Sequence, residues 1–212
     1  MSSATPDPAV DDASEPEERR SFLSELPGLL LAALVVAVLI KTFIIQPFYI
    51  PSGSMIPTLL IDDRVMVSKL NYRLGDPGHG DVVVFENPWA EERTESVPEK
   101  AVRAVLEALG IRTSQSDDLI KRVVGIGGDQ LEIRSGRVYI DDAALDEPYL
   151  PQDTSMPDYG PITIPAGHVF VMGDNRAASS DSRVFGPIPE SDIIGKAVMR
   201  IWPLDRLGSL SP

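Results

Sequence analysis

An apolar run of 20 residues, from Leu26 to Ile45, constrains this chain more than any other feature of its sequence. A helix of that length spans about 30 Å at about 1.5 Å per residue, which matches the hydrocarbon core of a bilayer. The run is longer than the apolar core of a cleaved signal peptide, and it lacks a clear small-x-small exit. A buried helix that is apolar all round does not suit a small soluble domain. We therefore expect residues 26–45 to form a permanent transmembrane anchor, with Lys41 reaching the membrane surface.

The segment before the run, residues 1–25, is polar and rich in proline, serine and acidic residues. Such a segment cannot bury enough apolar surface to order itself, so we expect a disordered acidic tail. The remainder, residues 46–212, is long enough for one folded domain. The net charge of −13 argues against a nucleic-acid-binding surface.

Residues that serve metal and thiol chemistry are scarce. The chain has no cysteine, which excludes disulfides, thiol catalysis and cysteine metal sites. Its two histidines, His79 and His168, are too few for a histidine-rich metal centre. His79 lies among glycines and is interpreted as a turn residue rather than a catalytic base. We expect neither a metal nor another cofactor.

Short apolar and alternating runs separated by turn signals follow the anchor, and they predict a mostly β, antiparallel domain. Ser135-Gly136 between two such runs predicts a two-residue hairpin loop. Residues 86–118 break the pattern, because they are charged and polar with one helical stripe, and we interpret them as an insertion in the β-core. The expected strands lie within residues 63–70, 81–85, 118–129, 130–134, 137–141, 162–164, 168–172 and 193–201.

The stretch Tyr49-Ile-Pro-Ser-Gly-Ser-Met-Ile-Pro-Thr-Leu59 follows the anchor closely. Two prolines fix φ and the central glycine allows geometry that a Cβ would forbid, so Ser52 and Ser54 lie on a stiffened turn. A serine held rigidly beside an apolar surface suits a peptide-cleaving nucleophile. A plain Ser/Pro/Gly linker loop is the alternative interpretation.

A serine hydroxyl needs a general base at neutral pH. Neither histidine lies in a triad-like motif, and neither G-x-S-x-G nor S-x-x-K occurs, which leaves a distant lysine. Only Lys121 lies in a mainly apolar run, where burial lowers the pKa of an amine. Its neighbour Arg122 stays charged and should point to the opposite face of the strand. A base and a structural ion pair both remain open for Lys121. The lysines compared are Lys41, Lys69, Lys100, Lys121 and Lys196.

Another polar segment reads Met172-Gly-Asp-Asn-Arg-Ala-Ala-Ser-Ser-Asp-Ser-Arg-Val-Phe-Gly186. Its composition is typical of a polar turn that contains an Asp–Arg pair.

Four segments, in order, resemble the boxes of the type I signal peptidases, a family of membrane-anchored Ser-Lys proteases. They are the serine stretch Pro51–Leu59, the strand-like Asp63–Leu70, Ile120-Lys-Arg-Val-Val-Gly125 and the Gly-Asp-Asn-Arg segment Met172–Gly186. Four boxes in order are a stronger signal than any one of them. The family often has Asp-Asn where this chain has Ala177-Ala178, a departure that touches neither the serine nor the ion pair.

The resemblance implies a signal-peptidase-like Ser-Lys protease fold on a single N-terminal transmembrane helix, with Ser54 as nucleophile and Lys121 as general base. It implies the remaining roles as well. These are Ser52 as the oxyanion-hole hydroxyl, Ser179 as the hydroxyl that orients the lysine, Asp181 and Arg183 as a supporting ion pair, and Asp174, Asn175 and Arg176 as the structural part of the box.

The resemblance further implies a serine endopeptidase of the plasma membrane that cleaves secretory preproteins after small residues at −1 and −3. The tail would be cytoplasmic and the domain extracytoplasmic, with signal peptides and the lipid bilayer as partners. The substrate would add to an exposed strand edge, which sets its register. Its shallow pockets are expected from Ile50, Pro51, Met55, Leu59 and Ile120.

Two other interpretations compete. A cytosolic Ser-Lys autoprotease that cleaves repressors would need a DNA-binding helical domain and a self-cleavage loop, whereas this chain offers an apolar span. An inactive membrane-anchored β-domain that only binds partners would keep its function when Ser54 or Lys121 is replaced.

Overall fold

The computed structural model describes residues 25–37, 44–70, 72, 75–89 and 118–210. The chain forms two compact units, Met1–Val38 and Leu39–Pro212. In the first unit, residues 25–37 form a helix whose side chains are exposed along its whole length. Within the described residues, no helix is long and apolar enough to cross a membrane.

Several predicted segments fall wholly or partly outside the described residues: the tail, residues 38–43 of the anchor and residues 90–117 of the insertion. The end of the predicted anchor needs a correction, because Ile45 begins strand β1 (Ile45–Tyr49) and pairs with Ser68. Pro47 lies in this strand, which is possible because β1 is the edge strand of its sheet.

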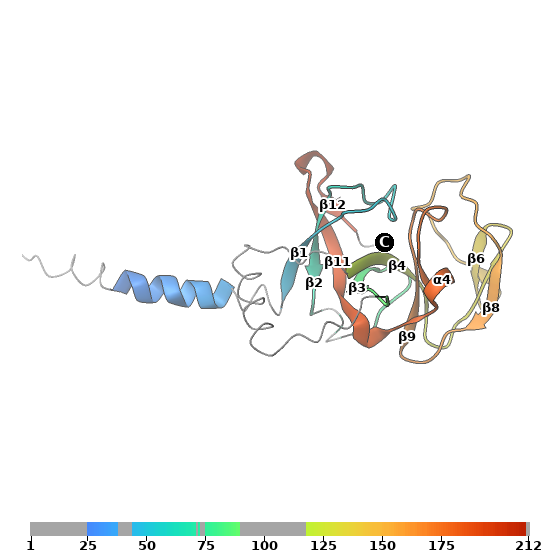
Figure 1. Ribbon diagram of the computed structural model, residues 1–212, viewed down its shortest axis with the longest axis horizontal. Coiled ribbons are helices and arrows are strands. Elements are labelled where there is room, and N and C mark those ends of the chain that lie inside the picture. The colour runs from blue at the N-terminus through green and yellow to red at the C-terminus, as the bar shows by residue number, and fades with distance from the viewer. Residues whose placement is uncertain (1–24, 38–43, 71, 73–74, 90–117, 211–212) are drawn as a thin grey trace, which may run out of the picture. The chain divides into compact units, whose positions relative to one another are not determined.

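The second unit is built from two antiparallel sheets (Figure 1). The larger sheet has the order β1-β2-β11-β3-β4-β9-β10, and β12 pairs with β11. The expectation of a mostly β, antiparallel domain is therefore confirmed. The strands of this sheet beyond β1 are β2 (Arg64–Ser68), β3 (Val82–Glu86), β4 (Asp118–Ile126), β9 (His168–Met172), β10 (Ile188–Pro189), β11 (Ile193–Trp202) and β12 (Gly208–Ser209), with the short helices α4 (Ser182–Phe185), η1 (Glu190–Asp192) and η2 (Leu204–Arg206) in the connections.

The centre of the larger sheet is covered on both faces. In β3, Val82 and Val84 belong to one apolar core, whereas Val83 and Phe85 belong to another. Successive side chains of a strand point to opposite faces, so a strand buried on both sides reads as a continuous apolar run. The neighbouring strand β4 obeys the same rule, and this is why charged residues within it need partners.

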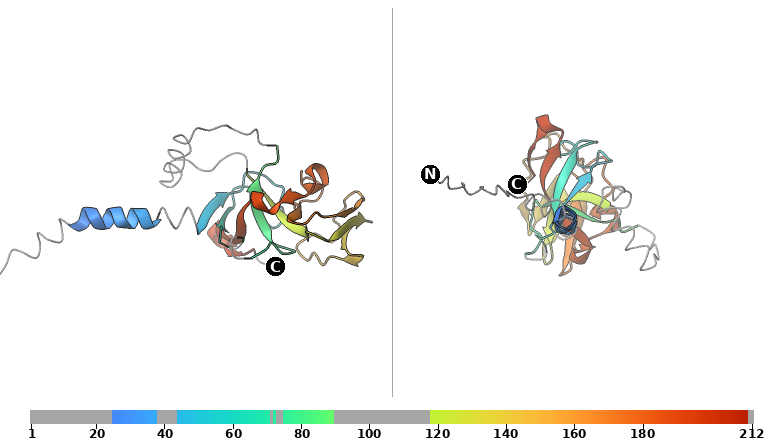
Figure 2. Two further views of the ribbon diagram at one scale, coloured as in Figure 1. Left: turned by 90° about the horizontal axis from the view of Figure 1, so that it is seen from below. Right: turned by 90° about the vertical axis from the view of Figure 1, so that its left-hand side faces the viewer.

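The smaller sheet has the order β7-β6-β5-β8 and lies to one side of the larger one (Figures 1 and 2). Ser135 and Gly136 both have positive φ (52° and 74°), as a type I′ hairpin turn requires, so the predicted two-residue loop is confirmed. Leu131 and Ile133 pack with Phe170 of β9 in a shared core, which fixes the two sheets to each other. The strands are β5 (Gln130–Arg134), β6 (Arg137–Ile140), β7 (Ala143–Ala144) and β8 (Tyr159–Thr163).

Candidate active site

The serine stretch forms a turn between β1 and β2 that is anchored by apolar side chains. Met55 and Leu59 are fully buried, and the Leu59 amide donates to Met55 O at 2.9 Å. At the ends of the turn, the Ile50 amide donates to Asp63 O at 2.9 Å. Ser54, partly exposed, is therefore carried on a well-packed support.

The structure brings Lys121 of β4 to Ser54. Lys121 Nζ donates to Ser54 Oγ at 2.8 Å and to Ile120 O at 2.9 Å. The lysine is only 3% exposed. Both acceptors are uncharged oxygens, so within the described part of the chain these contacts do not make the structural ion pair that was the alternative for Lys121.

Burial lowers the pKa of Lys121 to about 8. Loss of hydration disfavours the ammonium and is the largest cause, whereas the carboxylates of Asp181 and Asp174 act in the opposite direction. An amine with this pKa is neutral in roughly a tenth of the molecules at pH 7. The geometry thus couples a hydroxyl to an amine that readily accepts a proton.

Ser52 lies beside Ser54 on the same turn. Its hydroxyl is 3.5 Å from Ser54 Oγ, and the residue is exposed. A hydroxyl in this position can reach an oxygen that is bonded to the carbon under attack by Ser54.

The Gly-Asp-Asn-Arg segment holds the backbone of the serine turn. The Asn175 amide donates to Ser54 O at 3.0 Å, and Asn175 Nδ2 donates to Gly53 O at 3.0 Å. Gly173 approaches so closely that a Cβ there would lie 2.4 Å from Ser54 O and 2.3 Å from Ser179 Oγ. Only glycine fits at this contact without displacing the serine turn.

Asp181 and Arg183 form the ion pair that the resemblance implied. Arg183 Nε donates to Asp181 Oδ1 at 2.8 Å, and its Nη2 donates to Oδ2 at 2.9 Å. Asp181 is fully buried and also accepts from the Gly173 amide at 3.0 Å. The pair therefore fixes the glycine that contacts the serine turn.

Ser179 requires a correction. The resemblance implied that its hydroxyl bonds to the lysine, but Ser179 Oγ is buried and finds no hydrogen-bond partner within the described residues. The ammonium of Lys121 instead donates to the backbone carbonyl of Ile120 and to Ser54.

Arg122 is a member of the site's surroundings that the sequence analysis did not assign. It is 3% exposed, and its Nε and Nη2 donate to the two oxygens of Asp174 at 2.9 and 2.8 Å. Asp174 also accepts from the hydroxyl of Thr58, at the far end of the serine turn. The presence of a charged residue in a buried strand indicated that Arg122 needs a partner. The sequence did not show that this partner is Asp174.

Arg176 is also paired with a residue that the sequence analysis did not assign. Its side chain is fully buried and forms an ion pair with Glu147, which lies in the loop between β7 and β8. Arg176 Nε donates to Gly173 O at 3.1 Å. The box is therefore supported from the smaller sheet as well as from β4.

Four of the five predicted substrate-pocket residues point into the apolar core that supports the serine turn. These four belong to one buried apolar cluster, whereas Pro51 is exposed. The cluster is solid packing rather than an open cavity. Those four are Ile50, Met55, Leu59 and Ile120, with exposures of 1%, 0%, 0% and 7%.

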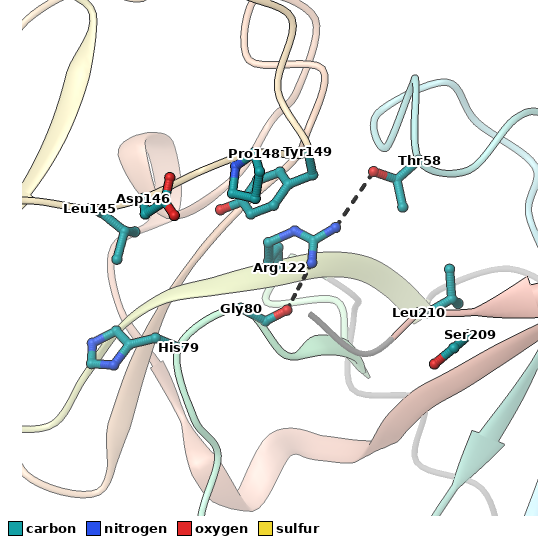
Figure 3. Close-up of a pocket in the computed structure, with 10 residues that line it drawn as sticks. All are labelled: Thr58, His79, Gly80, Arg122, Leu145, Asp146, Pro148, Tyr149, Ser209 and Leu210. Atoms are coloured by element: carbon teal, nitrogen blue, oxygen red, sulfur yellow. Dashed lines mark hydrogen bonds between the residues drawn. The ribbon is translucent and has the colours of Figure 1, made fainter.

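A pocket of about 380 Å³ lies elsewhere, on the Arg122 side of β4 (Figure 3). None of the predicted substrate-pocket residues lines it. Arg122 forms its floor and donates to Gly80 O at 2.8 Å. The ring of Tyr149 lies over the same guanidinium. The pocket therefore adjoins the support of the site, not the reacting groups.

One edge of β4 is open beside Lys121. Strand β9 pairs with β4 only from Arg122 to Ile126. On the opposite edge of β4, strand β3 pairs with residues 118–122. Among the described strands, none pairs with residues 119–121 on the β9 side. An extended peptide can add there and place its carbonyl near Ser54.

Among the described residues, no cluster of three or more His, Cys, Asp or Glu could hold a metal.

Comparison with known proteins gives the same family from a family model and from individual relatives. The family model described as "Signal peptidase, peptidase S26" matches residues 23–202. A signal peptidase I from Leptolyngbya laminosa is 37% identical over 207 residues, covering 97% of this chain and 92% of that protein. A signal peptidase I from Mycobacterium tuberculosis is 37% identical over 223 residues, covering 90% of this chain and 76% of that protein.

A crystal structure of a signal peptidase I from Enterococcus faecalis shows a weaker likeness. It has 23% identity and a TM-score of 0.42, over 58% of this chain and 98% of that chain. The family assignment rests on the sequence relatives.

Proposed function

Because this chain belongs to the signal peptidase family, peptidase S26, we propose that it is a membrane-bound serine endopeptidase that removes signal peptides from secreted preproteins. Ser54 is the nucleophile and Lys121 the general base. The observation that carries the proposal is the 2.8 Å contact between Lys121 Nζ and Ser54 Oγ, made by a lysine that is 3% exposed.

The reaction follows from this contact. Neutral Lys121 takes the proton of Ser54 Oγ as that oxygen bonds to the scissile carbonyl carbon. The C–N bond then breaks, and the lysine returns the proton to the leaving amine. Water, deprotonated by the same lysine, hydrolyses the acyl-enzyme and releases Ser54. Proton transfer through a single side chain requires an amine whose pKa is near the working pH.

Oxyanion stabilisation falls to Ser52 and to the backbone amide of Ser54. Ser52 Oγ lies 3.5 Å from Ser54 Oγ, within reach of the oxygen of a carbonyl under attack. One such donor contributes on the order of 3 kcal/mol to transition-state stabilisation. Asn175 and the Asp181–Arg183 pair hold the turn and Gly173 in place for this step.

Preference for small residues at −1 and −3 is part of the proposal. A peptide added to the open edge at residues 119–121 runs over the apolar cluster that contains Ile50, Met55, Leu59 and Ile120. Because these side chains are only 0% to 7% exposed, we expect the peptide to meet a closely packed surface here, which favours small side chains.

The test is turnover of a fluorogenic signal-sequence peptide by the full chain in detergent. Ser54→Ala and Lys121→Ala are expected to abolish turnover without unfolding, whereas Lys69→Ala, a lysine that follows β2, is the matched control. Peptides with alanine and with phenylalanine at −1 test the preference. Undiminished turnover by Lys121→Ala would overturn the base assignment, and no turnover by the wild type would favour a binding module.

Membrane attachment is the last part of the proposal. It is supported by the apolar run and by its exposed side chains in the described helix, among them Leu29 at 64% and Leu31 at 63% exposure. We place the tail in the cytoplasm and residues 46–212 outside the plasma membrane. Resistance to alkaline extraction tests the attachment, and protease accessibility of the domain in intact cells tests the orientation.

A further inference from the structure

The loop between β7 and β8 contacts both arginines that lie behind the catalytic pair. The guanidinium of Arg122 lies 3.8 Å from the centroid of the Tyr149 ring. Two residues earlier, Glu147 forms the ion pair with Arg176 and accepts from Tyr149 Oη at 2.9 Å. One short segment therefore fixes two cations, and its own two side chains are joined to each other.

Both arginines are attached to residues that touch the serine turn. Arg122 holds Asp174 through two hydrogen bonds, and Asp174 accepts from Thr58 at the end of that turn. Arg176 holds the Gly173 carbonyl at 3.1 Å.

The packing at Gly173 leaves little freedom for movement. A Cβ at that position would lie 2.4 Å from Ser54 O, so the glycine backbone is already close to the nucleophile's own carbonyl. Close-packed interiors transmit small displacements instead of absorbing them. We therefore expect a shift of either arginine to displace Ser54.

We propose that Tyr149 and Glu147 are positioning residues for the Ser54–Lys121 pair, acting through Arg122 and Arg176. This inference rests on the proposed function of that pair. Neither residue contacts Ser54 or Lys121 in the contacts described above. Tyr149 holds Arg122, and with it Asp174, on the face of β4 opposite Lys121, whereas Glu147 holds Arg176, which donates to the Gly173 carbonyl.

The chemistry of Tyr149 suits this role. Burial and the neighbouring Glu147 carboxylate raise the pKa of Tyr149, so its hydroxyl remains a proton donor to Glu147 at any working pH. The ring covers Arg122 where the guanidinium faces the pocket, as Figure 3 shows. A cation–π contact is stronger when water is kept away from the cation.

The test compares Tyr149→Ala with Tyr139→Ala in the signal-sequence peptide assay. Tyr139 is the matched control, because Arg134 lies over its ring at 3.9 Å in the β5–β6 hairpin, away from the catalytic pair. We expect Tyr149→Ala to lower kcat about 10- to 100-fold, the size of a misplacement effect, with KM nearly unchanged. Tyr139→Ala is expected to leave both constants unchanged.

Two further readouts separate positioning from a general loss of stability. Tyr149→Phe keeps the ring and should restore most of kcat, whereas Glu147→Gln should lower kcat without raising KM. In Tyr149→Ala the ascending limb of the pH profile should move to higher pH, because a displaced Arg122 would neutralise the Asp174 carboxylate less well, and this carboxylate would then stabilise the Lys121 ammonium more strongly. The carboxylates that act on this ammonium are Asp181 and Asp174.

The outcomes are distinct. The positioning role would be overturned if Tyr149→Ala and Tyr139→Ala had equal effects on kcat. It would also be overturned if Tyr149→Ala and Glu147→Gln lowered the melting temperature but left kcat and the pH profile unchanged. In both cases the peptidase function would still stand. Absence of turnover by the wild-type chain would instead overturn the proposed function, and the positioning role with it.

Discussion

Two adjacent residues of β4 show two ways to bury a cation. Lys121 and Arg122 are each 3% exposed, on opposite faces of the strand. Lys121 donates to two neutral oxygens, whereas Arg122 is held by both oxygens of a buried carboxylate. The first arrangement favours loss of the proton, and the second preserves the charge. Burial alone therefore does not determine the role of a cation, and the nature of its partners does.

The largest expected effect comes from placing an arginine on the Lys121 face of β4, so that both faces carry a permanently charged side chain. Lys121→Arg places a permanently charged group beside Ser54, so we expect kcat/KM to fall on the order of 10⁴-fold. In the wild type, kcat/KM should rise about tenfold between pH 7 and pH 9, because the base with a pKa of about 8 must be neutral. The variant should lack this rise, and Lys69→Arg is the control. A variant that keeps both the activity and the rise would refute the base assignment.

The next effect comes from removing the partner on the other face. Asp174→Asn leaves Arg122 buried with an unpaired charge, which costs roughly 3–5 kcal/mol in the free energy of unfolding. Urea unfolding in detergent measures it. The control is Asp142→Asn, because Asp142 is 84% exposed and meets Arg134 at 3.6 Å, a contact worth little. Equal stability of the two variants would show that Arg122 does not depend on its carboxylate.

Lys121 itself should lower stability at neutral pH. Its pKa of about 8 lies below the ordinary 10.5, so the unfolded chain binds its proton more tightly than the folded chain does. The destabilisation, roughly 3 kcal/mol, is fully present below about pH 8 and fades as the pH rises towards 10.5. Lys121→Met should therefore be more stable than the wild type at pH 7, with the difference shrinking above pH 8. A constant difference from pH 7 to pH 10.5 would contradict the lowered pKa.

A smaller effect is expected at the contact between the Gly-Asp-Asn-Arg segment and the serine turn. Gly173→Ala places a methyl group 2.4 Å from Ser54 O, which costs about 1–3 kcal/mol and displaces the nucleophile. We expect a large loss of turnover of the signal-sequence peptide, together with only a modest decrease in the melting temperature. In the control, Gly78→Ala, the new methyl would meet only an Asp81 oxygen at 3.9 Å. Full activity of Gly173→Ala would show that the turn is not held rigidly.

The smallest effect is expected at Ser179. Because its hydroxyl makes no hydrogen bond within the described residues, Ser179→Ala should change stability by less than about 0.5 kcal/mol and leave kcat nearly unchanged. A large loss of kcat would instead show that this hydroxyl bonds to Lys121 during turnover. That result would restore the orienting role that the resemblance implied.

The comparison of the two faces also shows how far sequence reasoning reaches. Alternation along the chain predicted the β-hairpin at Ser135-Gly136 and the antiparallel class, because side-chain direction and turn geometry are local properties. It missed β1, since Ile45–Tyr49 continues an apolar run and contains a proline that only an edge strand tolerates.

The sequence by itself determined which groups could react: a stiffened serine turn, a lysine in an apolar strand and an arginine that must face away from it. The tertiary structure decided which groups meet. Ser54 and Lys121 are 67 positions apart, and Arg122 and Asp174 are 52 apart. Partnership over such separations depends on strand order and register, which no local pattern encodes. The same is true of Glu147 and Tyr149, whose loop carries no motif and acquires its place only when the two sheets pack together.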